Sequence, residues 1–110
     1  MRLQVKGRNL ELSDSIRSYA EQKLSKLDKQ LGEMVQVEVE LAVERNPSIR
    51  ENQVAEATVF TKGHSLRVRE ATKDMRSSID GLTDKLMREV KEYRDKRRRE
   101  PRRRTEHNGA

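Results

Sequence analysis

The sequence contains no cysteine, no tryptophan and only two prolines. Without cysteine the chain can form neither a disulfide nor a thiolate metal site, which fits a reducing compartment. No stretch approaches the roughly 18 apolar residues of a membrane-spanning helix, and the first ten residues, MRLQVKGRNL, lack the apolar segment of a secretory signal. We therefore expect a cytoplasmic protein that does not bind membranes.

Catalytic and metal-binding patterns are also missing. His64 and His107 have no cysteine or second histidine at ligand spacing, and both are expected to be surface residues. The chain has no glycine-rich phosphate loop, no Walker lysine and no nucleophile elbow. We expect no enzyme activity, no cofactor, no metal and no small-molecule substrate.

Charge is abundant but unevenly distributed. The chain is 40% charged with a net charge of +6, and residues 94–104 contain eight basic and two acidic residues. The rest of the chain contains 17 basic and 17 acidic residues, and no Leu, Ile, Val or Phe follows Val90. This distribution predicts a near-neutral folded domain over residues 1–96 and a basic, disordered tail over residues 97–110.

Alternation of apolar and polar residues predicts four strands. The clearest covers residues 35–44, and the others cover residues 2–6, 53–60 and 65–70. The residues expected to face the core are Leu3, Val5, Val35, Val37, Val39, Leu41, Val43, Ala55, Ala57, Val59, Leu66 and Val68. The glutamates of the second and third strands are expected on the outer face, which would then repel polyanions.

Apolar spacings of three and four predict two helices. The first contains Ile16, Ala20, Leu24, Leu27 and Leu31, and the second contains Met75, Ile79, Leu82, Leu86, Val90 and Tyr93. Ser13 and Thr72 are the predicted N-caps, Gly32 the residue that follows the first helix, and Pro101 the end of the second.

The resulting element order, β-α-β-β-β-α, predicts an α+β fold. A right-handed crossover makes the first two strands parallel, and the remaining strands continue as an antiparallel meander. Both helices must bury their apolar stripes on one face of this four-stranded mixed sheet. We therefore expect a two-layer sandwich.

Basic residues on the helices are the candidate binding residues. Lys23 and Lys26 lie with Tyr19 on one flank of the first helix, where cations could contact phosphates and the ring could stack on a base. The alternative is a lysine-edged surface exposed to solvent. On the second helix Arg88 could instead pair with neighbouring acids such as Asp84 and Glu92.

Two segments resemble a known family, that of ribosome hibernation promoting factor and ribosome-associated inhibitor A, also called sigma-54 modulation proteins. The segments are VKGRNLELSDSIRSYAEQKLSKL, and VAEATVF followed by ATKDMRSSIDGLTDKLMREVKEYRDK; the resemblance covers residues 1–96. It implies binding to the small ribosomal subunit and its rRNA, across the mRNA and tRNA channel. Such a protein silences translation under stress or in stationary phase, on 70S particles or paired ribosomes.

The resemblance also implies which residues face RNA. The implied residues are Lys23, Lys26, Lys85, Arg88 and Lys91, with Arg17 and Arg94 as weaker candidates. The basic tail, including Arg97, Arg98 and Arg99, is expected to add affinity as a flexible arm. The chain departs from the family pattern at Glu89 and Glu92, where the family commonly has Gln and a basic residue, and both weaken the expected patch on the second helix.

Two alternatives to translation silencing remain open. One is a modulator that binds a transcription factor by protein contact, and the other is a general module for structured RNA. The family's longer members carry a C-terminal domain that pairs two ribosomes, so the chain is either a natural short form or a fragment of a long form. For the tail, the alternative is a solvated or membrane-attracted segment.

Overall fold

A computed structural model describes the backbone of residues 1–32 and 35–109 and the side chains of residues 1–32 and 35–96. Its elements are β1 (Arg2–Arg8), α1 (Asp14–Leu24), the 3₁₀ helix η1 (Ser25–Lys29), β2 (Gln36–Val43), β3 (Gln53–Thr61), β4 (His64–Thr72) and α2 (Met75–Gly109). The predicted element order is confirmed.

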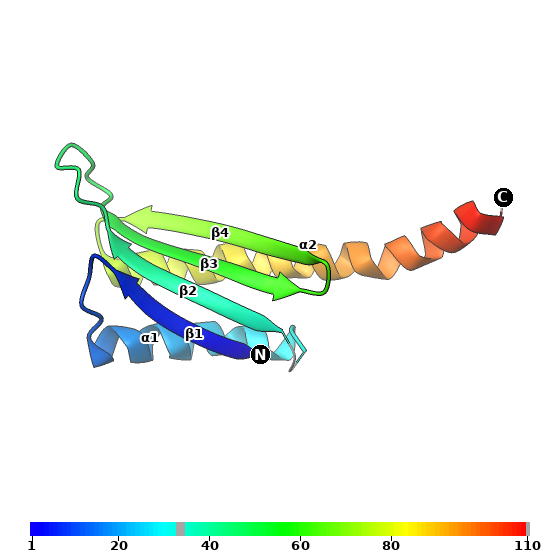
Figure 1. The fold of residues 1–110 in the computed structure, drawn as a ribbon, viewed down its shortest axis with the longest axis horizontal. Coiled ribbons are helices and arrows are strands. Elements are labelled where there is room, and N and C mark those ends of the chain that lie inside the picture. Colours follow the sequence, from blue (N-terminus) through cyan, green and yellow to red (C-terminus); the bar gives the residue numbers. More distant parts are fainter. Residues whose placement is uncertain (33–34, 110) are drawn as a thin grey trace.

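The four strands form one mixed sheet in the order β1-β2-β3-β4. β1 pairs with β2 in parallel, and the other two pairings are antiparallel. Both helices cover the same face of this sheet and run parallel to each other (Figure 1). The two-layer α+β sandwich is therefore as predicted, with β1 and β4 as its two edge strands.

The core lies between the sheet and the helices. Val37, Val39 and Leu41 of β2 are fully buried, as are Ala55, Ala57 and Val59 of β3. The helices contribute Ala20, Leu24, Leu27, Ile79, Leu82, Leu86 and Val90, all with no exposed surface. Val35, Val43 and Leu66 are half-buried, since they lie near strand ends or on the edge strand β4. The predicted inward faces are confirmed.

The helix boundaries differ from the prediction in detail. Ser13 caps α1 as expected, because its hydroxyl accepts the Ile16 N–H at 3.2 Å. Gly32 does not terminate this helix, because the chain tightens into η1 at Ser25, whose hydroxyl donates to the Gln22 carbonyl at 2.7 Å. A serine that binds a preceding carbonyl favours such tightening.

The start and end of α2 also require correction. Asp74 caps it by accepting the Ser77 N–H at 3.0 Å, so Thr72 is not the cap. The helix continues past Pro101 to Gly109, because a proline removes one helical hydrogen bond and bends a helix without always ending it. The side chains of residues 97–110 lie outside the described part, so a separate basic tail stays a prediction.

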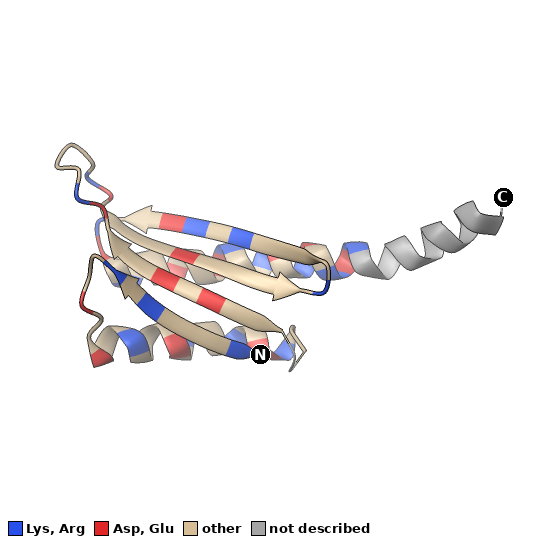
Figure 2. Cartoon of the chain, in the orientation of Figure 1, with Lys and Arg blue, Asp and Glu red and all other residues tan. Residues whose placement is uncertain are grey.

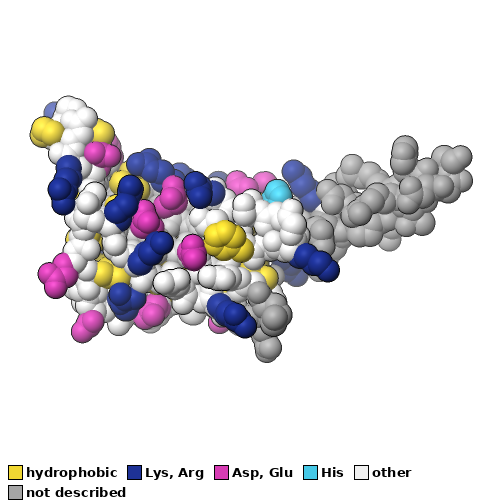
Figure 3. All heavy atoms as spheres, in the orientation of Figure 1, with side chains coloured by type: hydrophobic (Ala, Val, Ile, Leu, Met, Phe, Trp, Pro, Cys, Tyr) yellow, Lys and Arg dark blue, Asp and Glu magenta, His cyan; other side chains and the backbone are white. Residues whose placement is uncertain are grey.

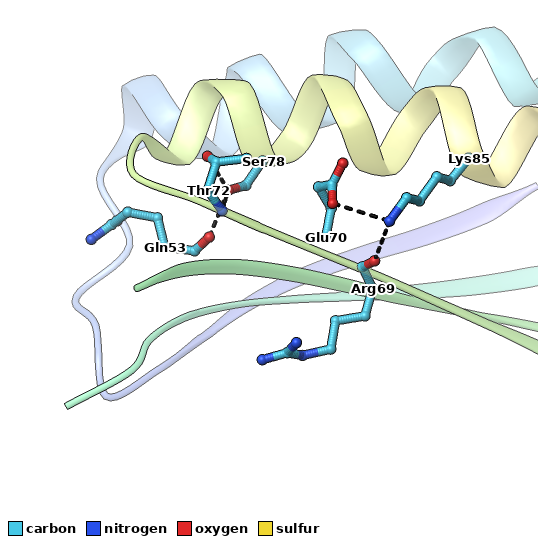
Figure 4. A network of polar contacts seen from close by, with 6 residues as sticks. All are labelled: Gln53, Arg69, Glu70, Thr72, Ser78 and Lys85. Atoms are coloured by element: carbon cyan, nitrogen blue, oxygen red, sulfur yellow. Dashed lines mark hydrogen bonds and ion pairs between the residues drawn. The ribbon is translucent and has the colours of Figure 1, made fainter. Parts of the chain in front are cut away.

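Ser78 connects the first turn of α2 to the sheet by hydrogen bonds (Figure 4). Its fully buried hydroxyl donates to the Gln53 carbonyl at 2.6 Å and accepts the Thr72 N–H at 3.0 Å. Thr72 thus acts as a partner of the helix rather than as its cap, and the hydroxyls of the two residues are 2.7 Å apart. This network fixes α2 where β3 begins and β4 ends.

The outer face of the sheet has mixed charge rather than the expected acidic character. Glu38, Glu40 and Glu56 occupy its centre, while Lys6 of β1 lies in register with Glu40. Arg67 and Arg69 of β4 border the other side, so basic residues of the two edge strands flank the glutamates of β2 and β3 (Figures 2 and 3). Arg8 forms an ion pair with Glu40 at 2.9 Å. The acidic prediction rested on the second and third strands alone, whereas the pairing of β1 and β4 with them adds basic residues to the same face.

Candidate nucleic-acid interface

The two helices meet along a surface that carries several of the predicted binding residues. We call this surface the helix seam; its polar residues are Tyr19, Lys23, Lys26 and Gln30 from α1, η1 and the residue after it, and Arg76, Asp80, Lys91, Arg94 and Asp95 from α2. Arg76, Asp80, Lys91 and Arg94 follow one another at spacings of 4, 11 and 3, and eleven residues are about three helical turns, which places them on one side of the helix. That side faces α1 and not β4.

A cluster of polar contacts joins the helices at one end of the seam. The Tyr19 hydroxyl donates to Asp80 Oδ1 at 2.6 Å, and the Lys23 ammonium lies 3.5 Å from the same oxygen. The Arg76 guanidinium donates to the Ser15 hydroxyl at 2.9 Å. Three residues of α1 thus contact α2 through its first two turns, which sets the distance between the helices.

The ring of Tyr19 is occupied by its neighbours. The Arg76 guanidinium carbon lies 4.8 Å from the ring centroid, and the Lys23 nitrogen lies 5.6 Å from it, both within cation–π range. The hydrogen bond to Asp80 raises the pKa of the Tyr19 hydroxyl, because ionisation would place a second negative charge beside the carboxylate. Tyr19 therefore orders cations on the seam, whereas the sequence predicted a ring open to a base.

Asp80 also pairs with Lys23. About half of the Asp80 side chain is exposed, and so is about a third of that of Lys23. A partly exposed pair of this kind contributes no more than about 1 kcal/mol to stability. It does, however, fix the direction of Lys23 and offsets part of its charge.

The other end of the seam is open and basic. A hollow of about 330 Å³ is lined by Gln30, Lys91, Arg94 and Asp95. The Oε1 atom of Gln30 is buried and has no hydrogen-bond partner among the described residues. A buried acceptor without a donor costs about 1–3 kcal/mol, so a ligand that donates a hydrogen bond would relieve this cost. Lys26, four residues before Gln30, is exposed.

The remaining predicted residues do not lie on the seam. Lys85 and Arg88 lie on the opposite side of α2, in a groove against Arg67 and Arg69 of β4. Glu89 and Glu92 line the same groove. Glu89 and Glu92, the two departures from the family pattern, therefore lie away from the seam cations Lys91 and Arg94.

Two predicted cations bind the edges of the sheet instead. The Arg17 guanidinium donates to the Val5 carbonyl of β1 at 2.6 Å. Lys85 donates to the Arg69 carbonyl of β4 at 3.2 Å and to Glu70 at 3.0 Å (Figure 4). Each side chain thus satisfies a carbonyl on an edge strand, where an unpaired backbone could recruit another strand.

The structure brings Lys91 and Arg94 together at one end of the seam and places Lys23 beside Asp80 at the other end. Lys85, Arg88 and Arg17 lie away from both. Arg97, Arg98 and Arg99 fall outside the described side chains. The sequence prediction missed Arg67, Arg69 and Arg76. Alternation with Leu66 and Val68 could have placed the first two on the outer face, whereas no local pattern shows that Arg76 reaches Ser15 and Tyr19.

The residues described hold no group of three or more His, Cys, Asp or Glu side chains placed to bind a metal ion. None of the helices in this part of the chain is long and apolar enough to cross a membrane. Arg88 forms no ion pair there with Asp84 or Glu92, so the expected pairs along α2 are absent from the described residues.

Comparison with known proteins gives consistent matches. Residues 3–98 match the family model described as sigma 54 modulation protein / S30EA ribosomal protein. The ribosome hibernation promotion factor of Picosynechococcus is 34% identical over 97 residues, which cover 87% of this chain and 50% of that protein. The ribosome hibernation promoting factor of Klebsiella oxytoca is 32% identical over 96 residues, covering 87% of this chain and 96% of that protein.

The fold has solved counterparts as well. The crystal structure of the Thermus thermophilus Protein Y N-terminal domain aligns with a TM-score of 0.69 at 33% identity, covering 84% of this chain and 99% of that one. The chain spans about half the length of the first curated relatives it matches. It spans nearly the full length of shorter relatives such as that of Klebsiella oxytoca.

Proposed function

Because the chain belongs to the family of sigma 54 modulation proteins and S30EA ribosomal proteins, we propose that it is a cytoplasmic ribosome hibernation factor. It binds the small ribosomal subunit and its rRNA in the channel for mRNA and tRNA and silences translation under stress or in stationary phase. It acts by occupying this channel, without catalysing a reaction. The names of its relatives support the ribosome as the partner.

The observation that carries the proposal is the open basic end of the helix seam. Lys91 and Arg94 present two cations at a hollow that Gln30 also lines, and the Oε1 atom of Gln30 has no hydrogen-bond partner among the described residues. Phosphates neutralise the cations, and a ribose 2′-hydroxyl or a base N–H can donate to the amide oxygen. RNA offers both groups in one strand, whereas a polyphosphate or an acidic peptide side chain offers only the anion.

Charge reversal at the seam tests the proposal. The variant Lys91→Glu/Arg94→Glu should bind purified 30S subunits at least about 30-fold more weakly, which is about 2 kcal/mol, because two phosphate contacts become repulsive. The matched control is Arg45→Glu/Arg50→Glu, which changes the same charge on the exposed loop between β2 and β3. The control should bind like the original protein.

The other two functions predict different results. A general module for structured RNA would bind an unrelated RNA duplex as tightly as 30S subunits. A transcription-factor modulator would not sediment with ribosomal particles from a lysate. Equal 30S affinity of the seam variant and the loop control would contradict the proposal, as would failure of the original protein to inhibit cell-free translation.

A further inference from the structure

The groove between β4 and α2 is a second charged surface, distinct from the helix seam. It consists of two adjoining hollows of about 410 and 390 Å³ that share Glu89 and Glu92. It runs from Arg69 along β4 to the hairpin at Gly63. A strand rises about 3.3 Å per residue, so the stretch from Arg69 to His64 alone is about 17 Å long. Such a groove suits an extended chain.

The groove contains more cations than the ion pairs of the described residues occupy. Apart from Lys85, which is bound to Glu70, its basic residues are Lys62, Arg88 and Lys96. Arg67 and Arg69 line its rim as well, but alternation with Val68 directs their side chains to the outer face of the sheet, as Figure 4 shows for Arg69. Within the described part of the chain none of these five forms an ion pair, and neither does Glu89 or Glu92. Cations and carboxylates thus share one groove without neutralising each other, and a ligand could bind both.

Rings and apolar side chains complete the groove. His64 of β4 and Tyr93 of α2 stack at one end, with ring centroids 5.3 Å apart and planes 7° apart. Leu66 and Val68 lie between the ring pair and the Arg69 end. A stacked ring pair beside apolar side chains provides a flat surface for a planar group.

We propose that this groove binds a short single strand of RNA and prefers bases with an exocyclic amino group. The cations would bind phosphates, the glutamates would accept hydrogen bonds from amino groups such as cytosine N4, and a base would stack at the ring pair. An acidic peptide satisfies the cations but is repelled by the glutamates, and a basic peptide does the reverse. In an RNA duplex the amino hydrogen left free by base pairing faces a deep, narrow major groove that side chains cannot read. The choice of RNA over DNA rests on the proposed function, whereas the groove itself is independent of the seam.

Fluorescence anisotropy with labelled oligonucleotides of about eight nucleotides, C8 and U8, tests this inference. Lys62→Glu/Arg88→Glu should weaken C8 binding at least about tenfold and make the log–log salt dependence shallower by about 1.4, since each lost phosphate contact is worth about 0.7 on a single strand. Arg45→Glu/Arg50→Glu is the control and should bind C8 like the original protein. Far-UV circular dichroism confirms that each variant is folded.

Replacement of the glutamates tests base recognition separately. The original protein should bind C8 more tightly than U8, and Glu89→Ala/Glu92→Ala should bring the ratio close to one. Affinity for U8 should not fall, because the change removes negative charge from the groove. A merely electrostatic groove would gain affinity for both oligonucleotides equally and keep the ratio unchanged, which would overturn the inference.

Three further results would also contradict it: equal C8 affinity of the groove variant and the loop control, competition by polyglutamate as strong as that by RNA, or loss of C8 binding only in Lys91→Glu/Arg94→Glu. The last result would locate oligonucleotide binding on the seam and leave the small-subunit proposal standing. Conversely, if neither the original protein nor any variant binds 30S subunits while C8 binding is intact, the small-subunit proposal is contradicted and the inference about the groove stands.

Discussion

Gly81 shows how a single residue couples helix to sheet. It lies in α2 opposite Glu70 of β4, and a Cβ at position 81 would come within 2.8 Å of the Glu70 Cγ atom. Glu70 is held there by Lys85, 3.0 Å away. An alanine could be accommodated only if Glu70 moved away and lost this ion pair.

We therefore expect Gly81→Ala to have different effects in two backgrounds. In Glu70→Ala protein it should raise the free energy of unfolding by about 0.5–1 kcal/mol, the usual gain of alanine over glycine inside a helix. In the original protein most of this gain should be lost with the Glu70–Lys85 contact. Urea unfolding of the four proteins gives the coupling energy, and an equal effect in both backgrounds would show that Glu70 moves freely.

Residue-level prediction from the sequence succeeded where the environment is set by near neighbours. Ser13 caps α1 because the cap depends on a residue three positions away. The partners of Thr72 and Asp80 could not be predicted this way, because Ser78 and Tyr19 reach them only after the helix has packed. Asp80 resembles any exposed helical acid until α1 places a hydroxyl and an ammonium beside it.

At the scale of elements, periodicity predicted the strands and helices but not the sides on which the cations lie. Periodicity shows which stripe of α2 is buried, and two polar flanks remain. The contacts with α1 and β4 show that one flank is the helix seam and the other is the β4 groove. The basic residues of α2 are divided between the helix seam and the β4 groove by tertiary packing, which the periodicity of α2 alone does not show.

Arg17 and Arg94 provide a matched test of this division. Both are single arginines on helices, but Arg17 binds the Val5 carbonyl of the edge strand β1, whereas Arg94 lines the seam hollow. Arg17→Gln should lower the free energy of unfolding by about 1 kcal/mol through the lost hydrogen bond and change 30S affinity only slightly. Arg94→Gln should lower 30S affinity and leave the free energy of unfolding nearly unchanged.

Thermal unfolding and 30S sedimentation of the two variants measure these effects. The variants remove the same charge, so a general electrostatic contribution to binding would lower 30S affinity equally in both. Equal loss would contradict the assignment of Arg17 to the sheet edge. An increased tendency of Arg17→Gln to aggregate would support it, because the β1 edge would then present an unpaired carbonyl.

At the scale of the whole molecule, the net charge divides unequally between the part with described side chains and the rest. Residues 1–96 contain 19 basic and 17 acidic residues, a net charge of +2, and residues 97–110 contribute the remaining +4. The core residues of α2 end at Val90, so removal of residues 97–110 leaves the packed layers intact. Charge and fold can thus be separated by one truncation.

A protein that ends at Lys96 should therefore keep its fold and its ribosomal site but lose affinity. The helix seam and the shape of the sandwich determine where the protein binds, whereas phosphate contacts by the arginines of residues 97–104 would add affinity without changing the location. Each lost contact should make the log–log salt dependence of 30S binding shallower by about 0.7–0.9. Titration of 30S subunits at several salt concentrations, with both lengths of chain, measures the change. Equal slopes would mean that these arginines make no phosphate contact, and binding would then depend on the seam cations of residues 1–96.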